Sequence, residues 1–135
     1  MDNAQPRADS VRPVVPPLRI TTAQLGSSAY VISVTGELDV SNAEQFSEES
    51  ARVIDRGATR MVVDLVGLSF MDSVALGALT KAANRIRSGD GECVVVVDDP
   101  RIRRVFEITG LERIFRIERS LAEAIEELLN GATAH

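Results

Sequence analysis

Apolar residues along the chain are grouped in short runs that predict the strands of a sheet. Two runs, at 18–25 and 29–38, flank a turn-forming segment at 26–28, which is typical of a hairpin. Because three residues are too few for a parallel crossover, these two strands are expected to pair antiparallel. The runs at 61–65 and 93–97 are almost wholly apolar, which indicates strands covered on both faces of a sheet.

Apolar residues at helical spacing predict four helices between and after these strands. The first helix starts at a capping box at 41–44 and ends near Gly57, and the second starts at 72–73. The third starts at 99–100, with aspartate as its cap and proline in the first turn, and the fourth starts at a capping box at 120–123. The residues predicted to face the core from these helices are Phe46, Ser50, Val53, Ile54, Leu76, Leu79, Ala83, Ile86, Ile102, Val105, Phe106, Thr109, Leu121, Ile125, Leu128 and Leu129.

The order of these elements predicts an α/β fold. A short run at 115–117 adds a candidate fifth strand before the last helix. Since crossovers between parallel strands are right-handed and short, we expect a mostly parallel four- to five-stranded sheet with one antiparallel N-terminal edge strand, flanked by four helices. The domain is predicted at 18–130. Residues 1–17 hold four of the five prolines and are expected to form a tail without regular structure, and 131–135 a short C-terminal tail.

Composition and charge exclude several classes of function. A net charge of −5 argues against nucleic acid as the main partner, because phosphate-binding proteins usually carry a basic face. The single cysteine fits a reducing compartment, and neither a signal pattern nor a run of about 20 apolar residues is present, so a cytoplasmic protein without membrane contact is expected. No nucleotide-binding loop and no Cys/His cluster of metal-ligand spacing is found, so no cofactor and no metal are predicted. The sequence predicts no particular oligomeric state.

Ser73 is the candidate functional residue, because it stands where a strand passes through a turn into a helix. A serine at this place can be a helix cap, a nucleophile or a phosphoacceptor. A nucleophile needs a nearby base, but the only histidine is His135, at the end of the chain, and the only lysine is Lys81, eight residues further along the same helix. That spacing is roughly 12 Å along a helix axis. We therefore predict no enzyme and no catalytic residue, and both a cap and a phosphoacceptor remain open.

The segment around Ser73, DLVGLSFMDSVALGAL, resembles the signature of STAS domains, the sulphate-transporter and anti-sigma-factor-antagonist family. The stretch GELD at 36–39 and the later run RRVFEITGLERIFRI agree with that family, and together the matching stretches span 18–129. One departure is Val74-Ala75, where the family usually has Ser or Thr followed by Gly.

The resemblance implies a stand-alone anti-sigma-factor antagonist with Ser73 as its phosphorylated residue. In the implied mechanism the unphosphorylated protein binds an anti-sigma factor with serine kinase activity and so releases a sigma factor, and phosphorylation switches the binding off. The rival interpretation is a scaffold or sensor module that is not phosphorylated, binds a protein or a small ligand, and uses Ser73 only as a cap.

Several neighbours of Ser73 are predicted to share its site. Asp39 follows the second strand, and the carboxyl ends of parallel strands meet at one sheet edge, so Asp39 and Asp72 are expected near Ser73. We expect the partner to dock over Val74, Gly77 and Lys81 on the helix that Ser73 begins. A glycine inside a helix costs about 1 kcal/mol relative to alanine, so Gly77 indicates close packing, either with this protein's own loop or with a partner.

Overall fold

The computed structural model describes residues 17–133. The predicted N-terminal tail therefore lies, except for Pro17, outside the described residues. The strands are β1 (Arg19–Leu25), β2 (Ala29–Leu38), β3 (Arg60–Asp64), β4 (Leu68–Met71), β5 (Glu92–Val96) and β6 (Arg116–Glu118). The helices are α2 (Ala43–Asp55), α3 (Ser73–Ser88), α4 (Pro100–Thr109) and α5 (Leu121–Thr133), with a short 3₁₀ helix η1 (Leu111–Arg113).

The strands form one six-stranded sheet in the order β1-β2-β3-β5-β6, with β4 paired to the end of β2. The β1–β2 pair is antiparallel, with Arg19 opposite Thr35 and Leu25 opposite Ala29, and the other described strand pairs are parallel. This arrangement confirms the predicted α/β class, with its antiparallel N-terminal edge strand and four helices. The sheet contains one strand more than the predicted maximum of five.

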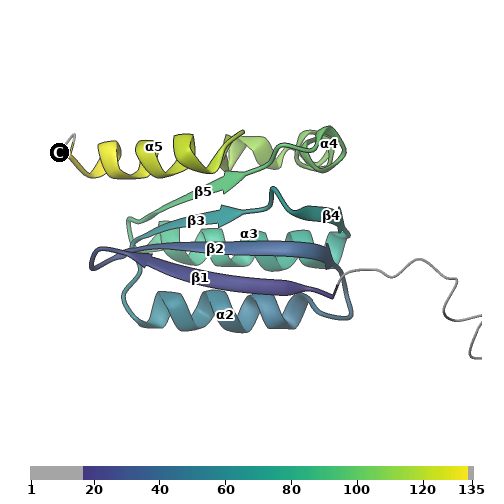
Figure 1. Ribbon diagram of the computed structural model, residues 1–135, viewed down its shortest axis with the longest axis horizontal. Helices are drawn as coiled ribbons and strands as arrows, with labels where there is room; N and C mark the ends of the chain where they lie inside the picture. Colours follow the sequence, from purple (N-terminus) through teal and green to yellow (C-terminus); the bar gives the residue numbers. More distant parts are fainter. Residues whose placement is uncertain (1–16, 134–135) are drawn as a thin grey trace, which may run out of the picture.

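Helices cover both faces of the sheet: α2, α3 and α4 contribute to the larger core cluster on one face, and α5 alone contributes to the smaller cluster on the other. In Figure 1, α2 lies below the strands and α5 above them. Alternate residues of β2 serve the two faces, since Ile32 belongs to the larger core cluster and Val31 to the smaller one beneath α5. Cys93 lies in the larger cluster at 4% exposure, and burial raises the pKa of its thiol to about 12. The thiol is therefore a packing group, protonated at neutral pH.

Two of the predicted core-facing helix residues are exposed. Thr109 donates its hydroxyl hydrogen bond back to the Val105 carbonyl oxygen at 2.7 Å, which leaves it at the surface of α4. Leu129 is 45% exposed, while Ala124 and Leu128 fill the core from α5. That helix extends to residue 133, beyond the predicted domain boundary at 130.

Strand β4 replaces the second half of the turn that the sequence predicts between β3 and α3. It pairs with β2 beyond an irregularity between Gly36 and Glu37, where Gly36 adopts a positive φ of 100°. Gly36 N–H donates to the Gly67 carbonyl oxygen at 3.1 Å, and the Ser69 hydroxyl donates to the Gly36 carbonyl oxygen at 3.1 Å. The extra residue of this irregularity is Ser69 in β4, because Gly36 lies opposite Leu68 and Glu37 opposite Phe70. The pairing brings β4, and the start of α3 after it, to the carboxyl edge of the sheet.

Gly67 is needed for the close approach of the β3–β4 turn to β2. A Cβ atom added at Gly67 would lie 2.5 Å from Cγ2 of Thr35. We expect Gly67→Ala to lower the free energy of unfolding by about 1–3 kcal/mol, the range for overpacking a close contact. Denaturant melts should show the loss, Thr35→Ala should recover most of it in the double variant, and Gly77→Ala, whose added Cβ meets open space, is the matched control.

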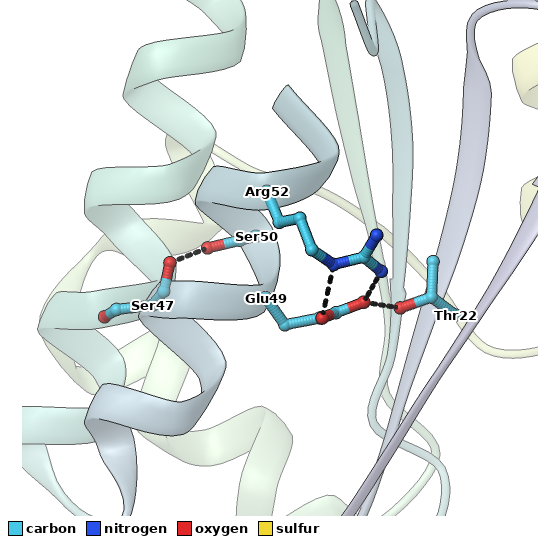
Figure 2. Close-up of polar contacts among 5 residues, drawn as sticks. All are labelled: Thr22, Ser47, Glu49, Ser50 and Arg52. Atoms are coloured by element: carbon cyan, nitrogen blue, oxygen red, sulfur yellow. Dashed lines mark hydrogen bonds and ion pairs between the residues drawn. The ribbon is translucent and has the colours of Figure 1, made fainter. Parts of the chain in front are cut away.

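Edge strand β1 is held to α2 by a small polar cluster of Thr22, Glu49 and Arg52 (Figure 2). The Thr22 hydroxyl donates to the Glu49 carboxylate, and Arg52 donates to the same carboxylate from Nε at 3.0 Å and from Nη2 at 2.5 Å. The hydrogen bond from Arg52, helped by that from Thr22, lowers the pKa of Glu49 below its ordinary value of 4.5 despite the opposing effect of burial.

The cluster makes stability depend on pH in one direction. A carboxyl whose pKa is lowered by folding stabilises the folded state above its unfolded pKa, and this contribution is lost as pH falls through the folded pKa. Between about pH 6 and about pH 3 the wild type should therefore lose more free energy of unfolding than Glu49→Gln. Chemical denaturation at a series of pH values tests this, and parallel pH profiles for the two proteins would contradict it.

Candidate functional site

Asp72 caps helix α3 and also ties it to the loop after β2. Its Oδ1 accepts the backbone N–H of Ala75 at 2.9 Å, and its Oδ2 accepts that of Val40 at 2.9 Å. Because Asp72 is the N-cap and Ser73 the first helical residue, the interpretation of Ser73 as the cap is wrong. The hydroxyl of Ser73 is therefore not needed to cap the helix.

Ser73 is exposed at the carboxyl edge of the sheet, where α3 begins (Figure 1). Its hydroxyl makes no hydrogen bond to any residue that the structure describes. The first backbone N–H groups of a helix lack intrahelical partners and carry a partial positive charge. The position therefore offers an accessible hydroxyl in surroundings that tolerate added negative charge on the oxygen.

The loop from Asp39 to Asn42 lies beside this helix start, held there by the hydrogen bond from Val40 to Asp72. Asp39 Oδ1 accepts from both the backbone N–H and the hydroxyl of Ser41, at 2.9 and 2.5 Å. The carboxylate of Asp39 thus orders its own loop, and the expected effect of Asp39 on Ser73 stays a prediction.

Asn42 is a residue of this loop that the sequence analysis did not single out. Its side chain accepts the N–H of Asp39 and donates to the Glu37 carbonyl oxygen, both at 2.9 Å. It occupies the N-cap position of α2 without capping that helix through its side chain. The predicted capping box starting at Ser41 is therefore wrong, because Asn42 and Ser41 bind loop atoms instead.

A groove of about 470 Å³ runs from Ser73 along the exposed side of α3. Gly77 and Lys81, which the sequence predicts at the partner interface, line it together with Ser73, while Leu111 of η1 contributes from outside the helix. Val74 is not among the lining residues but is 48% exposed beside them. The structure thus brings Ser73, Gly77 and Lys81 to one surface.

Gly77 has no packing role within the described protein. A Cβ atom built on it meets nothing within 4 Å. Close packing against the protein's own loop, one of the two reasons considered for this glycine, is therefore wrong. Glycine is unfavourable inside a helix. At position 77 it makes no internal contact that would require its small size, and it leaves open space beside α3.

Three apolar side chains close to Asp72 in the sequence or through its hydrogen bond to the Val40 N–H are exposed, and we call them the apolar rim: Val40, Phe70 and Val74, with exposures of 69%, 47% and 48%. Single exposed apolar residues are ordinary, but a group of them beside a groove is typical of a docking surface. Val40 and Phe70 escape prediction because one lies in a loop and the other in the unpredicted β4. In the sequence, each is marked only by being an apolar residue that belongs to no strand or helix pattern.

Among residues 17–133, no group of three or more His, Cys, Asp and Glu side chains could hold a metal ion. No helix in that range combines the length and the apolar character that crossing a membrane requires. The candidate site is therefore described by Ser73, its groove and the apolar rim.

Comparison with known proteins identifies the family: residues 20–124 match the STAS domain, so the chain belongs to the STAS domain family. The chain is similar to BtrV of Bordetella bronchiseptica, with 34% identity over 90 residues that cover 67% of this chain and 78% of BtrV. It is also similar to the anti-sigma-B factor antagonist of Staphylococcus aureus, with 32% identity over 88 residues, 65% of this chain and 82% of that protein.

The fold is shared with the solved structure of an anti-sigma factor antagonist. The crystal structure of an anti-sigma factor antagonist from Mycobacterium paratuberculosis superimposes with a TM-score of 0.76 at 25% identity, covering 83% of this chain and 94% of that one. The resemblance implied by the motif around Ser73 is thereby confirmed at the level of family and fold.

Proposed function

We propose that this protein is an anti-sigma factor antagonist that binds an anti-sigma factor with serine kinase activity and is switched off by phosphorylation of Ser73. The observation that carries the proposal is the exposed hydroxyl of Ser73, which no described residue engages, at the first position of α3. In its unphosphorylated form the protein occupies the anti-sigma factor and so releases a sigma factor for transcription. It acts as a binding protein and as the substrate of the kinase, not as an enzyme.

The apolar rim and the groove along α3 supply the contact surface for the partner. Association with the partner can bury the apolar surface of the rim, and each Å² buried stabilises the complex by roughly 25 cal/mol. Gly77 leaves room for the partner's backbone close to the helix, and Lys81 supplies a positive charge within the groove, about two turns beyond Ser73. Val74 stands beside Ser73 and links the rim to the groove.

Phosphorylation acts on this surface through charge. A phosphoserine adds about −1.5 to −2 charges. A phosphate about 4 Å from a partner carboxylate costs roughly 1 kcal/mol in water and roughly 4 kcal/mol at a partly desolvated interface. These values correspond to a loss of affinity of about fivefold to a thousandfold, so the switch requires no large change of the fold.

Displacement of a sigma factor tests the proposed function. The purified anti-sigma factor, bound to its labelled sigma factor, is titrated with this protein in the absence of ATP. We expect the sigma factor to be released at stoichiometric concentration by the wild type and by Ser73→Ala alike. No release by either protein would contradict the antagonist function.

A non-phosphorylated scaffold is the alternative, favoured by Val74-Ala75 in place of the residues that usually follow the phosphorylated serine in this family. In that case the apolar rim binds a protein partner and Ser73 is never modified. Release of the sigma factor that persists after incubation with kinase and ATP would support the scaffold over the switch.

A further inference from the structure

Strand β1 forms one edge of the sheet, and among the described residues it pairs only with β2. All seven of its residues, Arg19–Leu25, pair with β2 in one continuous register. The outer side of β1 therefore presents a row of backbone N–H and C=O groups to which another strand can bind. The opposite edge strand, β6, has only three residues, and its Arg116 pairs with Glu92 and Glu127.

The sequence of β1 lacks the features that usually keep an edge strand from pairing. Proteins protect such edges with proline, with lysine or other charges, with a bulge or by making the strand very short. Strand β1 consists of RITTAQL, which contains no proline and a single charge, Arg19, at its first position. Its register with β2 shows no irregularity, and Thr21, Ala23 and Gln24 are exposed. A strand from another molecule can therefore add to this edge.

An antiparallel pair of β1 strands from two copies is self-complementary around Thr22, the middle residue of the seven. Full overlap gives the opposite pairs Thr22–Thr22, Thr21–Ala23, Ile20–Gln24 and Arg19–Leu25. No like charges face each other in this register. A shift by one residue would set side chains of opposite faces against each other, and a shift by two would leave two residues of each strand unpaired.

The polar cluster at Thr22 adds a charge pattern that fits the same axis. The Thr22 hydroxyl and the Arg52 guanidinium bind the same Glu49 carboxylate (Figure 2), so both charged groups lie level with Thr22 along the strand. They stand on the side of α2 away from α3, since Ser47 and Ala51 line the groove between the two helices. A two-fold axis through Thr22, perpendicular to the sheet, therefore brings these charges of both copies together, with acid next to base around the axis.

We propose that β1 binds β1 of a second copy of this chain, antiparallel around Thr22, so that the two sheets become one continuous sheet. Backbone hydrogen bonds between the strands supply the main contact, and Glu49 and Arg52 of each copy pair with Arg52 and Glu49 of the other. Because the strand is complementary to itself in both register and charge, the occupant is a second copy rather than an unrelated strand. The edge shares no residue with the groove that runs from Ser73 along α3, so the pairing is separate from the proposed phosphorylation switch.

Two charge variants of β1, measured by analytical ultracentrifugation, test the pairing. Thr21→Lys/Ala23→Lys sets lysine against lysine twice in the antiparallel pair, whereas Thr21→Lys/Ala23→Glu sets lysine against glutamate twice at the same positions. The wild type is expected to dimerise with a Kd of about 100 µM or tighter, and the first variant at least about tenfold more weakly. The second variant should dimerise as tightly as the wild type or more tightly.

The controls separate this pairing from folding and from the proposed switch. Both substituted positions are exposed in the single copy, so both variants should fold, and circular dichroism melts check this. Ser73→Glu should dimerise as the wild type does, because Ser73 takes no part in the pairing. A wild type that stays monomeric up to about 1 mM protein would overturn the proposal. Equal dimerisation of the two charge variants would also overturn it, since the interface would then lie elsewhere.

Discussion

Replacing Ser73 with glutamate is expected to weaken binding to the anti-sigma factor by about tenfold or more, while Ser73→Ala leaves the affinity close to that of the wild type. Glutamate sets one negative charge where the partner docks, less than the −1.5 to −2 of a phosphate. The loss should therefore be smaller than that produced by phosphorylation itself. Isothermal titration of the three proteins measures the difference.

The fold should be unaffected by this change, which makes the result interpretable. A carboxylate in the first turn of a helix is stabilising by about 0.3–1 kcal/mol, so Ser73→Glu should melt at or above the wild-type temperature. Ser27→Glu is the matched control, because it adds the same charge in the β1–β2 hairpin, at the opposite end of the sheet (Figure 1). Equal affinities for Ser73→Glu and Ser27→Glu would remove Ser73 from the interface.

Gly77→Gln should abolish measurable binding of the partner while the protein stays folded. The space beyond Gly77 is open, since an added Cβ meets nothing within 4 Å. A long side chain therefore projects into the groove without disturbing the core. Gly77→Ala should raise the free energy of unfolding by up to about 1 kcal/mol and change the affinity much less than glutamine does.

The corresponding control is Ala122→Gln, which adds the same side chain at an exposed position of α5, on the other face of the sheet. Titration of the purified anti-sigma factor with the three variants gives the comparison. A folded Gly77→Gln protein that binds as tightly as Ala122→Gln would place the interface away from this groove.

Most of the fold can be predicted from the sequence because apolar residues recur at strand or helix spacing, and because capping residues, glycine or proline mark the ends of most elements. Strand β4 is the exception, since four residues are too few for a pattern and both Ser69 and Phe70 in its middle are exposed. It forms through pairing with the end of β2, from Gly36 onward, which is a contact over more than 30 residues of chain. Leu129 is predicted to face the core together with Leu128, but adjacent residues of an α-helix point about 100° apart, and only Leu128 is buried.

The candidate site is predictable in its main residue but not in its surroundings. Ser73 stands out because the pattern changes from strand to helix beside it, and Gly77 because glycine is unfavourable inside a helix. The division of tasks between Asp72 and Ser73 depends on backbone geometry, since either side chain can cap a helix. Val40 joins the site only because its N–H reaches Asp72 across 32 positions of sequence, and no local pattern can indicate such a contact.

The position of the phosphate after reaction with the kinase tests the central claim most directly. The wild type and Ser73→Ala are incubated with the purified anti-sigma factor kinase and ATP, and incorporated phosphate is located by mass spectrometry of peptides. We expect a single phosphate on Ser73 in the wild type and essentially none in Ser73→Ala. Equal incorporation into both proteins, or a phosphate confined to another residue, would contradict it.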